Sequence, residues 1–151
     1  MRRAIKSLLG GLGYEIRRAP AGEAYHRDDF GDQARLLDGR APVILDVGAN
    51  VGHSVETYRK LFPGATIHAF EPSPDALREL RPRAAALANV HVHDVAVGDA
   101  DSTAVLHTHK GSFNNSLLST SAESVTHAPA DLKWAFESTG EQTIRTVRVA
   151  G

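Results

Sequence analysis

The sequence predicts an α/β protein built on a doubly wound parallel sheet, and the order of its apolar segments carries this prediction. Apolar runs of strand length lie at residues 43–47, 66–70 and 90–97, and helical patterns separate them. Strands that alternate with helices form parallel sheets. Right-handed crossovers place the second strand beside the first. The carboxyl ends of the strands then meet at one edge, where such sheets bind ligands.

Length and composition limit the class of protein. The chain has 151 residues, 42% of them hydrophobic, and 17 basic and 18 acidic residues give a net charge of −1. We therefore expect one domain and no nucleic-acid partner, because no overall basic field is present. The absence of cysteine excludes disulfides, cysteine-zinc sites and thiol catalysis. No apolar run approaches the roughly 20 residues of a membrane helix, so we expect no membrane span and a soluble, cytoplasmic protein.

The first 39 residues are expected to form a helical leader, and residues 40–151 the main domain. Within the leader, the spacing of apolar residues predicts a helix over 2–9, a short strand over 14–18 and a second helix over 29–37.

The main domain opens with residues 43–47, an apolar run broken only by Asp46, which predicts a strand buried on both faces. A helix over 53–62 follows. Ser73-Pro74-Asp75 then predicts another helix start, with Ser at the N-cap, Pro at the first position and an acid in the first turn. Pro82 predicts a kink or a restart within that helix.

The pattern changes after the third strand. Residues 103–108 alternate like a strand, and we expect them to form a hairpin with residues 90–97. Residues 110–128 are rich in Ser, Asn and Thr and predict a loop. A short helix over 129–138 and a strand over 143–149 complete the prediction.

The most informative segment is Val43-Ile-Leu-Asp-Val-Gly-Ala-Asn-Val-Gly52, a strand that runs through Asp46 into a glycine-bearing turn. Gly48 and Gly52 allow a ligand to approach the backbone, and the following helix N-terminus favours a carboxylate. Asp46 can meet a cationic amino group. Glu71, nineteen residues past Gly52, ends the next strand and can accept hydrogen bonds from both ribose hydroxyls. We interpret this pattern as a site for S-adenosylmethionine (SAM).

Three alternatives compete with this interpretation. A nicotinamide fingerprint is G-x-G-x-x-G, whereas the glycines here are spaced G-x-x-x-G. A Walker-type phosphate loop needs G-K-[ST], which is absent. The third alternative is a glycine turn that binds no ligand, and the turn by itself does not exclude it. Glu71 at the end of the next strand favours cofactor binding over this alternative.

These residues resemble the FkbM-type SAM-dependent methyltransferases. The resemblance covers roughly residues 40–120, and Leu12-Gly-Tyr-Glu-Ile16 is similar to the leader that often precedes this domain. The segments that carry it are Leu45-Asp-Val-Gly-Ala-Asn-Val-Gly52, Ile67-His-Ala-Phe-Glu-Pro-Ser-Pro74, Val95-Ala-Val-Gly-Asp99 and Asn115-Ser-Leu117. Most methyltransferases of this fold carry Gly where Asn50 stands.

The resemblance implies a Rossmann-like class I methyltransferase sheet, SAM as methyl donor, and O-methylation of a hydroxyl on a sugar or secondary metabolite. It implies no catalytic residue and no metal. The cofactor-binding residues that it implies are Asp46, Gly48, Ala49, Asn50 and Gly52 in the methionine-side turn, Glu71 at the ribose, Pro72 and Ala96 at the adenine, and Asn115 and Ser116 at the mouth of the site.

The family continues through a segment resembling L-K-I-D-x-E-G, which this sequence does not reach. We therefore expect a sheet truncated after its first half, and weak or absent catalysis by residues 1–151 alone. The alternative function is a non-catalytic or degenerate ligand-binding fragment of such a domain. A partner chain or an oligomer could complete such a fragment.

Several polar residues outside the motif are weaker candidates. If residues 90–97 and 103–108 formed a hairpin, the imidazoles of its two strands could gather and would suit zinc or nickel. A half-exposed polar strand face is the simpler interpretation, so we expect no metal site. Solvent exposure or turn formation likewise explains the other candidates. The residues considered are His91, His93, His107 and His109 for the metal, and Asp94, Asp99 and His53 for catalysis.

Overall fold

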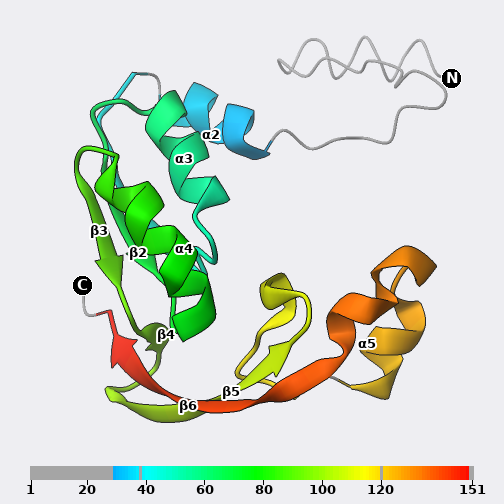
Figure 1. The fold of residues 1–151 in the computed structure, drawn as a ribbon. Coiled ribbons are helices and arrows are strands. Elements are labelled where there is room, and N and C mark those ends of the chain that lie inside the picture. Colours follow the sequence, from blue (N-terminus) through cyan, green and yellow to red (C-terminus); the bar gives the residue numbers. More distant parts are fainter. Residues whose placement is uncertain (1–28, 38, 120, 150–151) are drawn as a thin grey trace, which may run out of the picture.

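The structure, a computed structural model, describes residues 29–37, 39–119 and 121–149. The helix and strand expected over 2–9 and 14–18 lie outside the described residues. The described chain is a mixed α/β structure (Figure 1). Its elements before residue 94 are α2 (Asp29–Leu37), β1 (Val43–Val47), α3 (His53–Leu61), β2 (Thr66–Phe70), α4 (Pro74–Ala85) and β3 (Val90–His93).

The first sheet is parallel, with the order β1-β2-β3, which confirms the expected neighbours. Its register aligns Ile44 with Ile67 and Ile67 with Val90, so these side chains share the face that α3 and α4 cover. Ile67 and Leu80 are fully buried between the sheet and the helices. α2 packs against α3 through an edge-on contact of Phe30 with Tyr58.

The start of α4 agrees with the expected signals. Ser73 occupies the N-cap and Pro74 the first position, although the Ser73 hydroxyl makes no cap bond. The helix continues through Pro82 as one element, so the expected restart does not occur. Pro82 is exposed near the last turn, where the missing N–H removes one bond on the solvent side.

The opposite face of the first sheet is open in the part of the chain that the structure describes. Val43, Leu45 and Val47 are 69%, 51% and 59% exposed, and β1 pairs with β2 alone. The prediction that β1 is buried on both faces is therefore wrong. Ile44 packs on the face of the sheet that the helices cover. No described element covers the opposite face, on which Val43, Leu45 and Val47 lie.

A second sheet follows, with the order β4-β6-β5, formed by β4 (Ala96–Gly98), β5 (Ser102–His109) and β6 (Ser138–Arg148). The expected third strand is thus two strands, because the chain leaves the first sheet at Asp94. The predicted hairpin with residues 103–108 is also wrong. β5 pairs antiparallel with β6, and β4 pairs parallel with β6.

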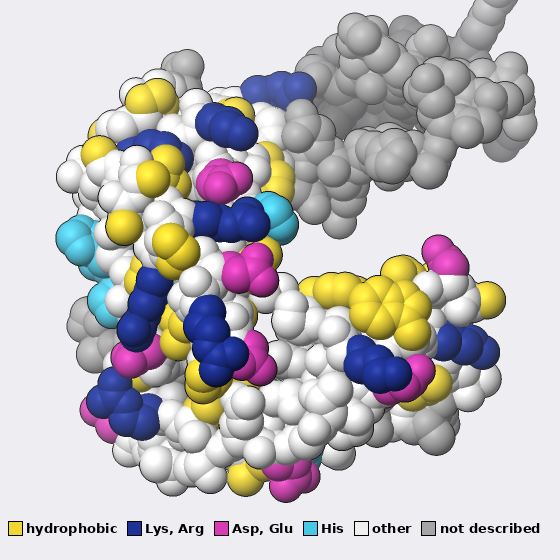
Figure 2. All heavy atoms as spheres, viewed as in Figure 1, with side chains coloured by type: hydrophobic (Ala, Val, Ile, Leu, Met, Phe, Trp, Pro, Cys, Tyr) yellow, Lys and Arg dark blue, Asp and Glu magenta, His cyan; other side chains and the backbone are white. Residues whose placement is uncertain are grey.

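The segment expected to be a loop, residues 110–128, contains η1 (Ser112–Asn114) and α5 (Ala122–His127), and the helix expected over 129–138 is the 3₁₀ helix η2 (Ala130–Phe136). Figure 2 shows basic and acidic side chains interspersed on the face that it presents, in agreement with the near-zero net charge. None of the described helices has the length and apolarity that crossing a membrane requires.

Candidate cofactor site

A cavity of about 420 Å³ opens where the carboxyl ends of β1 and β2 meet β4, β5 and η1. The glycine turn forms one side of it and the segment after β5 forms the other. Of the residues expected to bind a cofactor, the cavity is lined by Gly48, Asn50, Glu71, Pro72, Ala96, Asn115 and Ser116.

The turn after β1 needs left-handed backbone at three positions. Gly48, Asn50 and Gly52 have φ of 81°, 48° and 96°. A Cβ on Gly48 would meet no atom within 4 Å, and Gly48 lines the cavity. The missing side chain of Gly48 therefore leaves space that a ligand can occupy.

Gly52 and Ala49 lie behind this turn instead of in the cavity. A Cβ on Gly52 would come within 2.9 Å of Leu80 Cδ1, so a side chain at this position collides with α4. Ala49 is buried in the core cluster between the sheet and the helices. Both residues shape the turn by close packing, and neither is among the residues that line the cavity.

The N–H groups of the turn are largely used within the chain. Gly48 and Ala49 both donate to the Phe70 carbonyl, at 2.9 and 3.1 Å, and Gly52 donates to the Ala49 carbonyl at 2.9 Å. Asn50 donates to Glu71 Oε2 at 2.8 Å. A ligand is expected to approach the backbone of this turn, but these N–H groups are already paired. The structure shows that they join β1 to the end of β2.

Glu71 is the buried carboxylate of the cavity, 6% exposed. Its Oε2 accepts the Asn50 N–H and its Oε1 accepts the Ser73 N–H, each at 2.8 Å. Burial raises the pKa of Glu71 above its ordinary value, the two backbone hydrogen bonds oppose that rise, and the nearby charge of Asp46 adds to it. A carboxylate has about four lone-pair sites, so two remain for hydroxyl donors in the cavity.

Asp46 is turned toward the start of α3 and is not among the residues that line the cavity. Its Oδ2 accepts a hydrogen bond of 2.6 Å from Ser54 Oγ. Burial raises the pKa of Asp46, and the Ser54 hydrogen bond opposes the rise. Asp46 thus braces the first turn of α3 and lends negative charge to the neighbourhood of Glu71.

The chemistry of the cavity suits the nucleoside part of SAM. Ribose needs hydroxyl acceptors, which the remaining lone pairs of Glu71 provide. An adenine ring needs flat apolar contacts, and Pro72 and Ala96 line the same cavity. Gly48 adds a position without a side chain. The residues present therefore fit the cofactor that the sequence suggested.

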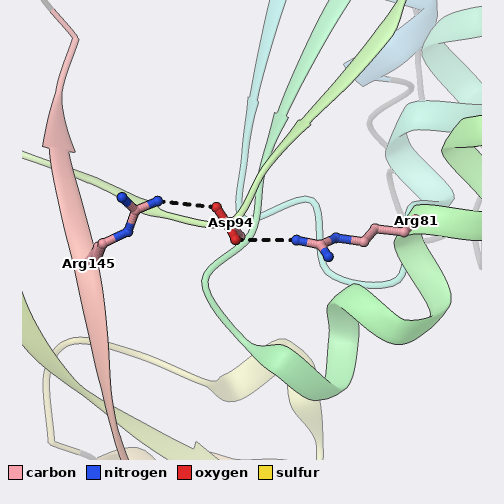
Figure 3. Close-up of polar contacts among 3 residues, drawn as sticks. All are labelled: Arg81, Asp94 and Arg145. Atoms are coloured by element: carbon pink, nitrogen blue, oxygen red, sulfur yellow. Dashed lines mark hydrogen bonds and ion pairs between the residues drawn. The ribbon is translucent and has the colours of Figure 1, made fainter.

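The weaker candidates lie elsewhere. His53 is exposed beside Arg83, and Asp99 is exposed in the turn before β5. Asp94 lines a second cavity of about 400 Å³, where it bridges Arg81 of α4 and Arg145 of β6, each at 3.3 Å (Figure 3). This double ion pair ties the second sheet to the first.

The histidine cluster that was considered as the less favoured interpretation does not form, because its two strands belong to different sheets. His91 and His93 instead stack with His68 of β2 on the open face. His107 contacts Glu141 of β6 at 3.2 Å. Among the described residues, no group of three or more His, Cys, Asp or Glu side chains could hold a metal ion.

Ser112 and Phe113 also line the cavity and were not predicted from the sequence. Ser112 Oγ donates a hydrogen bond of 3.0 Å to Asn50 Oδ1, and Phe113 is 61% exposed. The polar composition of residues 110–128 marked a loop near the site. It contained no signal that would single out these two residues.

Comparison with known proteins identifies the family. A family model described as the methyltransferase FkbM domain matches residues 46–150. The chain belongs to the FkbM methyltransferase family. The resemblance seen in the sequence is thereby confirmed, and its motifs are those that line or support the cavity.

Two curated relatives share part of this FkbM-family chain. The 31-O-demethyl-FK506 methyltransferase FkbM of Streptomyces tacrolimicus is 38% identical over 99 residues, which cover 62% of this chain and 35% of the relative. The 2-O-methyltransferase NoeI of Sinorhizobium fredii (strain NBRC 101917 / NGR234) is 33% identical over 76 residues, 50% of this chain and 31% of the relative. The chain spans about a third of the length of these relatives. No solved structure matches it.

Proposed function

We propose that the chain is the cofactor-binding part of a SAM-dependent O-methyltransferase. The observation that carries this proposal is the convergence of residues from two neighbouring strand ends, and from the start of a third, on one cavity. Those residues are Gly48, Asn50, Glu71, Pro72 and Ala96. Family membership supports a transferase, and the cavity supports a nucleoside-bearing donor.

Each residue has a task in this proposal. Glu71 accepts hydrogen bonds from the ribose hydroxyls with the lone pairs that Asn50 and Ser73 leave unused. Pro72 and Ala96 flank the adenine, and Gly48 admits the methionine end close to the backbone. Asp46, through its charge, attracts the cationic amino group. When bound, SAM supplies a methyl group on a sulfonium sulfur, already activated for transfer to an oxygen.

The acceptor in this proposal is a hydroxyl on a sugar or another secondary metabolite. One relative is named a 2-O-methyltransferase and the other a methyltransferase of a 31-O-demethyl compound, which supports oxygen as the acceptor atom. Asn115 and Ser116 line the cavity on the side away from the turn and would meet the acceptor there. Alignment of the hydroxyl with the donor is then the main contribution of the protein.

The proton of the hydroxyl needs an acceptor at the cavity. Glu71 is the one ionisable residue among the described residues that line the cavity, and backbone N–H groups anchor both its oxygens. We propose that polypeptide outside the described residues, in the same or a partner chain, brings the base. The alternative of a non-catalytic, ligand-binding unit is supported by the same lack of a free ionisable side chain among the described residues that line the cavity.

The open face of β1 supports a completing polypeptide. Val43, Leu45 and Val47 form an exposed apolar strip beside an edge without a described strand. We propose that covering this strip completes a doubly wound class I sheet, with residues 40–151 as its first part and residues 1–39 as a leader. The acceptor would be a small molecule or glycan, and a cytoplasmic location belongs to the same proposal.

Calorimetric titration with S-adenosylhomocysteine tests the proposal directly. The wild-type chain should bind it, and Ala96→Leu should weaken binding at least tenfold because the larger side chain fills the cavity. Ala100→Leu, in the exposed turn after β4, is the matched control and should bind like wild type. Absence of binding by a folded wild-type chain, or equal affinity of the two variants, would refute the proposal.

A further inference from the structure

We propose that Asn50 is a positioning residue whose side chain, bonded to Ser112, holds residues 111–117 against the cofactor cavity. We call this hydrogen bond the latch. Its effect on affinity rests on the proposed function, whereas its effect on the ligand-free chain does not. Nothing in the family resemblance or in the relatives' names assigns a role to Ser112.

The latch connects two parts of the chain that are 62 residues apart. Ser112 Oγ donates to Asn50 Oδ1 at 3.0 Å, and both side chains are partly buried. Asn50 belongs to the turn after β1, and Ser112 begins η1 after β5. Because both residues line the cavity, the bond closes its wall at the point where the two parts meet.

The backbone of Asn50 does not explain why this residue is Asn. Its φ of 48° is left-handed, a conformation that glycine adopts at lower cost. Its N–H bond to Glu71 would be available to glycine as well. What Asn adds is a side-chain acceptor, and in the structure that acceptor binds Ser112. The latch therefore explains why Asn, and not glycine, occupies this left-handed position.

The other end of the latch is firmly held. Gly111 donates to the Ala135 carbonyl at 3.2 Å, and Asn115 Oδ1 accepts the His109 N–H at 2.9 Å. Ser116 exchanges two backbone hydrogen bonds with His107. Residues 111–117 therefore belong to the β5–β6 unit.

The latch thus restrains one sheet relative to the other at the cavity. In Figure 1, β5 and β6 extend away from the first sheet and its helices. The ion pairs of Asp94 join the sheets at a different cavity, away from Ser112. Without the latch, residues 111–117 can move away from the turn, and the cavity loses one ordered wall.

Four variants test this inference. Asn50→Gly and Ser112→Ala each remove one partner of the latch. The double variant removes both partners but loses the same single hydrogen bond, and Ser112→Thr keeps the hydroxyl. S-adenosylhomocysteine affinity should fall about three- to tenfold in Asn50→Gly and in Ser112→Ala, as the loss of one hydrogen bond gives. The double variant should be no weaker than the weaker single one, and Ser112→Thr should bind like wild type. Ser102→Ala, an exposed serine of β5, is the control and should change nothing.

Hydrogen exchange of the ligand-free chain gives a second, independent readout. Asn50→Gly and Ser112→Ala should both speed exchange of the Asn114 and Asn115 amides severalfold, and Ser112→Thr should not. Unchanged exchange and affinity in the two single variants, or equal losses in Ser112→Ala and Ser112→Thr, would overturn the latch. Faster exchange in a chain whose wild type binds no S-adenosylhomocysteine would support the latch and refute the proposed function.

Discussion

The backbone N–H of Asn50 donates a 2.8 Å hydrogen bond to Glu71 Oε2, which fastens the turn after β1 to the carboxylate that ends β2. Ser73 fastens the other oxygen of the same carboxylate. Glu71 therefore has a structural duty in addition to the ligand contact that we propose for it. Separate measurements of stability and of binding can distinguish the two roles.

Replacement of Glu71 by Ala should affect both stability and binding. The buried Ser73 N–H and the partly buried Asn50 N–H lose their acceptor, at a cost of up to about 1–3 kcal/mol each in unfolding free energy. S-adenosylhomocysteine affinity should fall at least tenfold, because hydrogen bonds to a charged group contribute about 1.5–3 kcal/mol each. Denaturant unfolding and calorimetry measure the two effects. Glu79→Ala, an exposed carboxylate of α4, is the control. A Glu71→Ala chain as stable and as tightly binding as wild type would contradict both roles.

The glycines of left-handed conformation should differ in their tolerance of Ala. Gly52→Ala should lower the unfolding free energy by more than about 2 kcal/mol, because the strained φ adds to a collision with Leu80. Gly39→Ala has a φ of 71° and open space, so it should cost only the strain, about 1–2 kcal/mol. Gly48→Ala should cost as much as Gly39→Ala and also weaken S-adenosylhomocysteine binding. Equal destabilisation by all three substitutions would show that Leu80 does not restrict Gly52.

Acid should weaken the open face of the first sheet through His93. His68 Nδ1 and His93 Nε2 lie 3.0 Å apart, so one imidazole must accept the other's proton. Burial lowers the pKa of His93, and the neighbouring His68 and His91 lower it further, against an opposing effect of Asp94. A folded-state pKa below the unfolded value of about 6.5 gives stability that is present above that pH and lost as the pH falls through the lowered pKa. His93→Gln should make the unfolding free energy less dependent on pH over this range. An unchanged dependence on pH would contradict the explanation.

The exposed strip on β1 should govern self-association of residues 1–151. Leu45→Thr should reduce association in light scattering behind a sizing column, because it breaks a contiguous apolar surface. Leu36→Thr, at a leucine of α2 that is even more exposed, should leave association unchanged. If Leu36→Thr reduced association as much as Leu45→Thr, the strip would not be the surface responsible.

The sequence predicted the elements whose signal is local. The helix over 29–37 and the strands over 43–47 and 66–70 have the expected bounds, since apolar spacing and turn residues define each of them. Strand partners could not be predicted in the same way. Residues 103–108 read as a strand, but their partner β6 begins some thirty residues later, and no local signal distinguishes that partner from β3. Likewise, the apolar run of β1 could not indicate that one face lacks a cover among the described elements.

The residues of the candidate site also differ in how far the sequence could predict them. Gly48, Asn50 and Glu71 belong to a turn and a strand end that are neighbours in the sheet, so their meeting followed from the order of elements. Ser112 reaches the cavity only because β5 pairs with β6 and turns η1 back toward Asn50. The position of Ser112 depends on tertiary packing, which the polar composition of residues 110–128 does not indicate.

A crystal structure of the chain with S-adenosylhomocysteine bound tests the central claim most directly. We predict that the nucleoside occupies the cavity beside Gly48 and Ala96, with ribose hydroxyls about 2.6–3.0 Å from the Glu71 carboxylate. A ligand bound elsewhere on a folded chain, or a cavity empty at saturating ligand, would contradict the account.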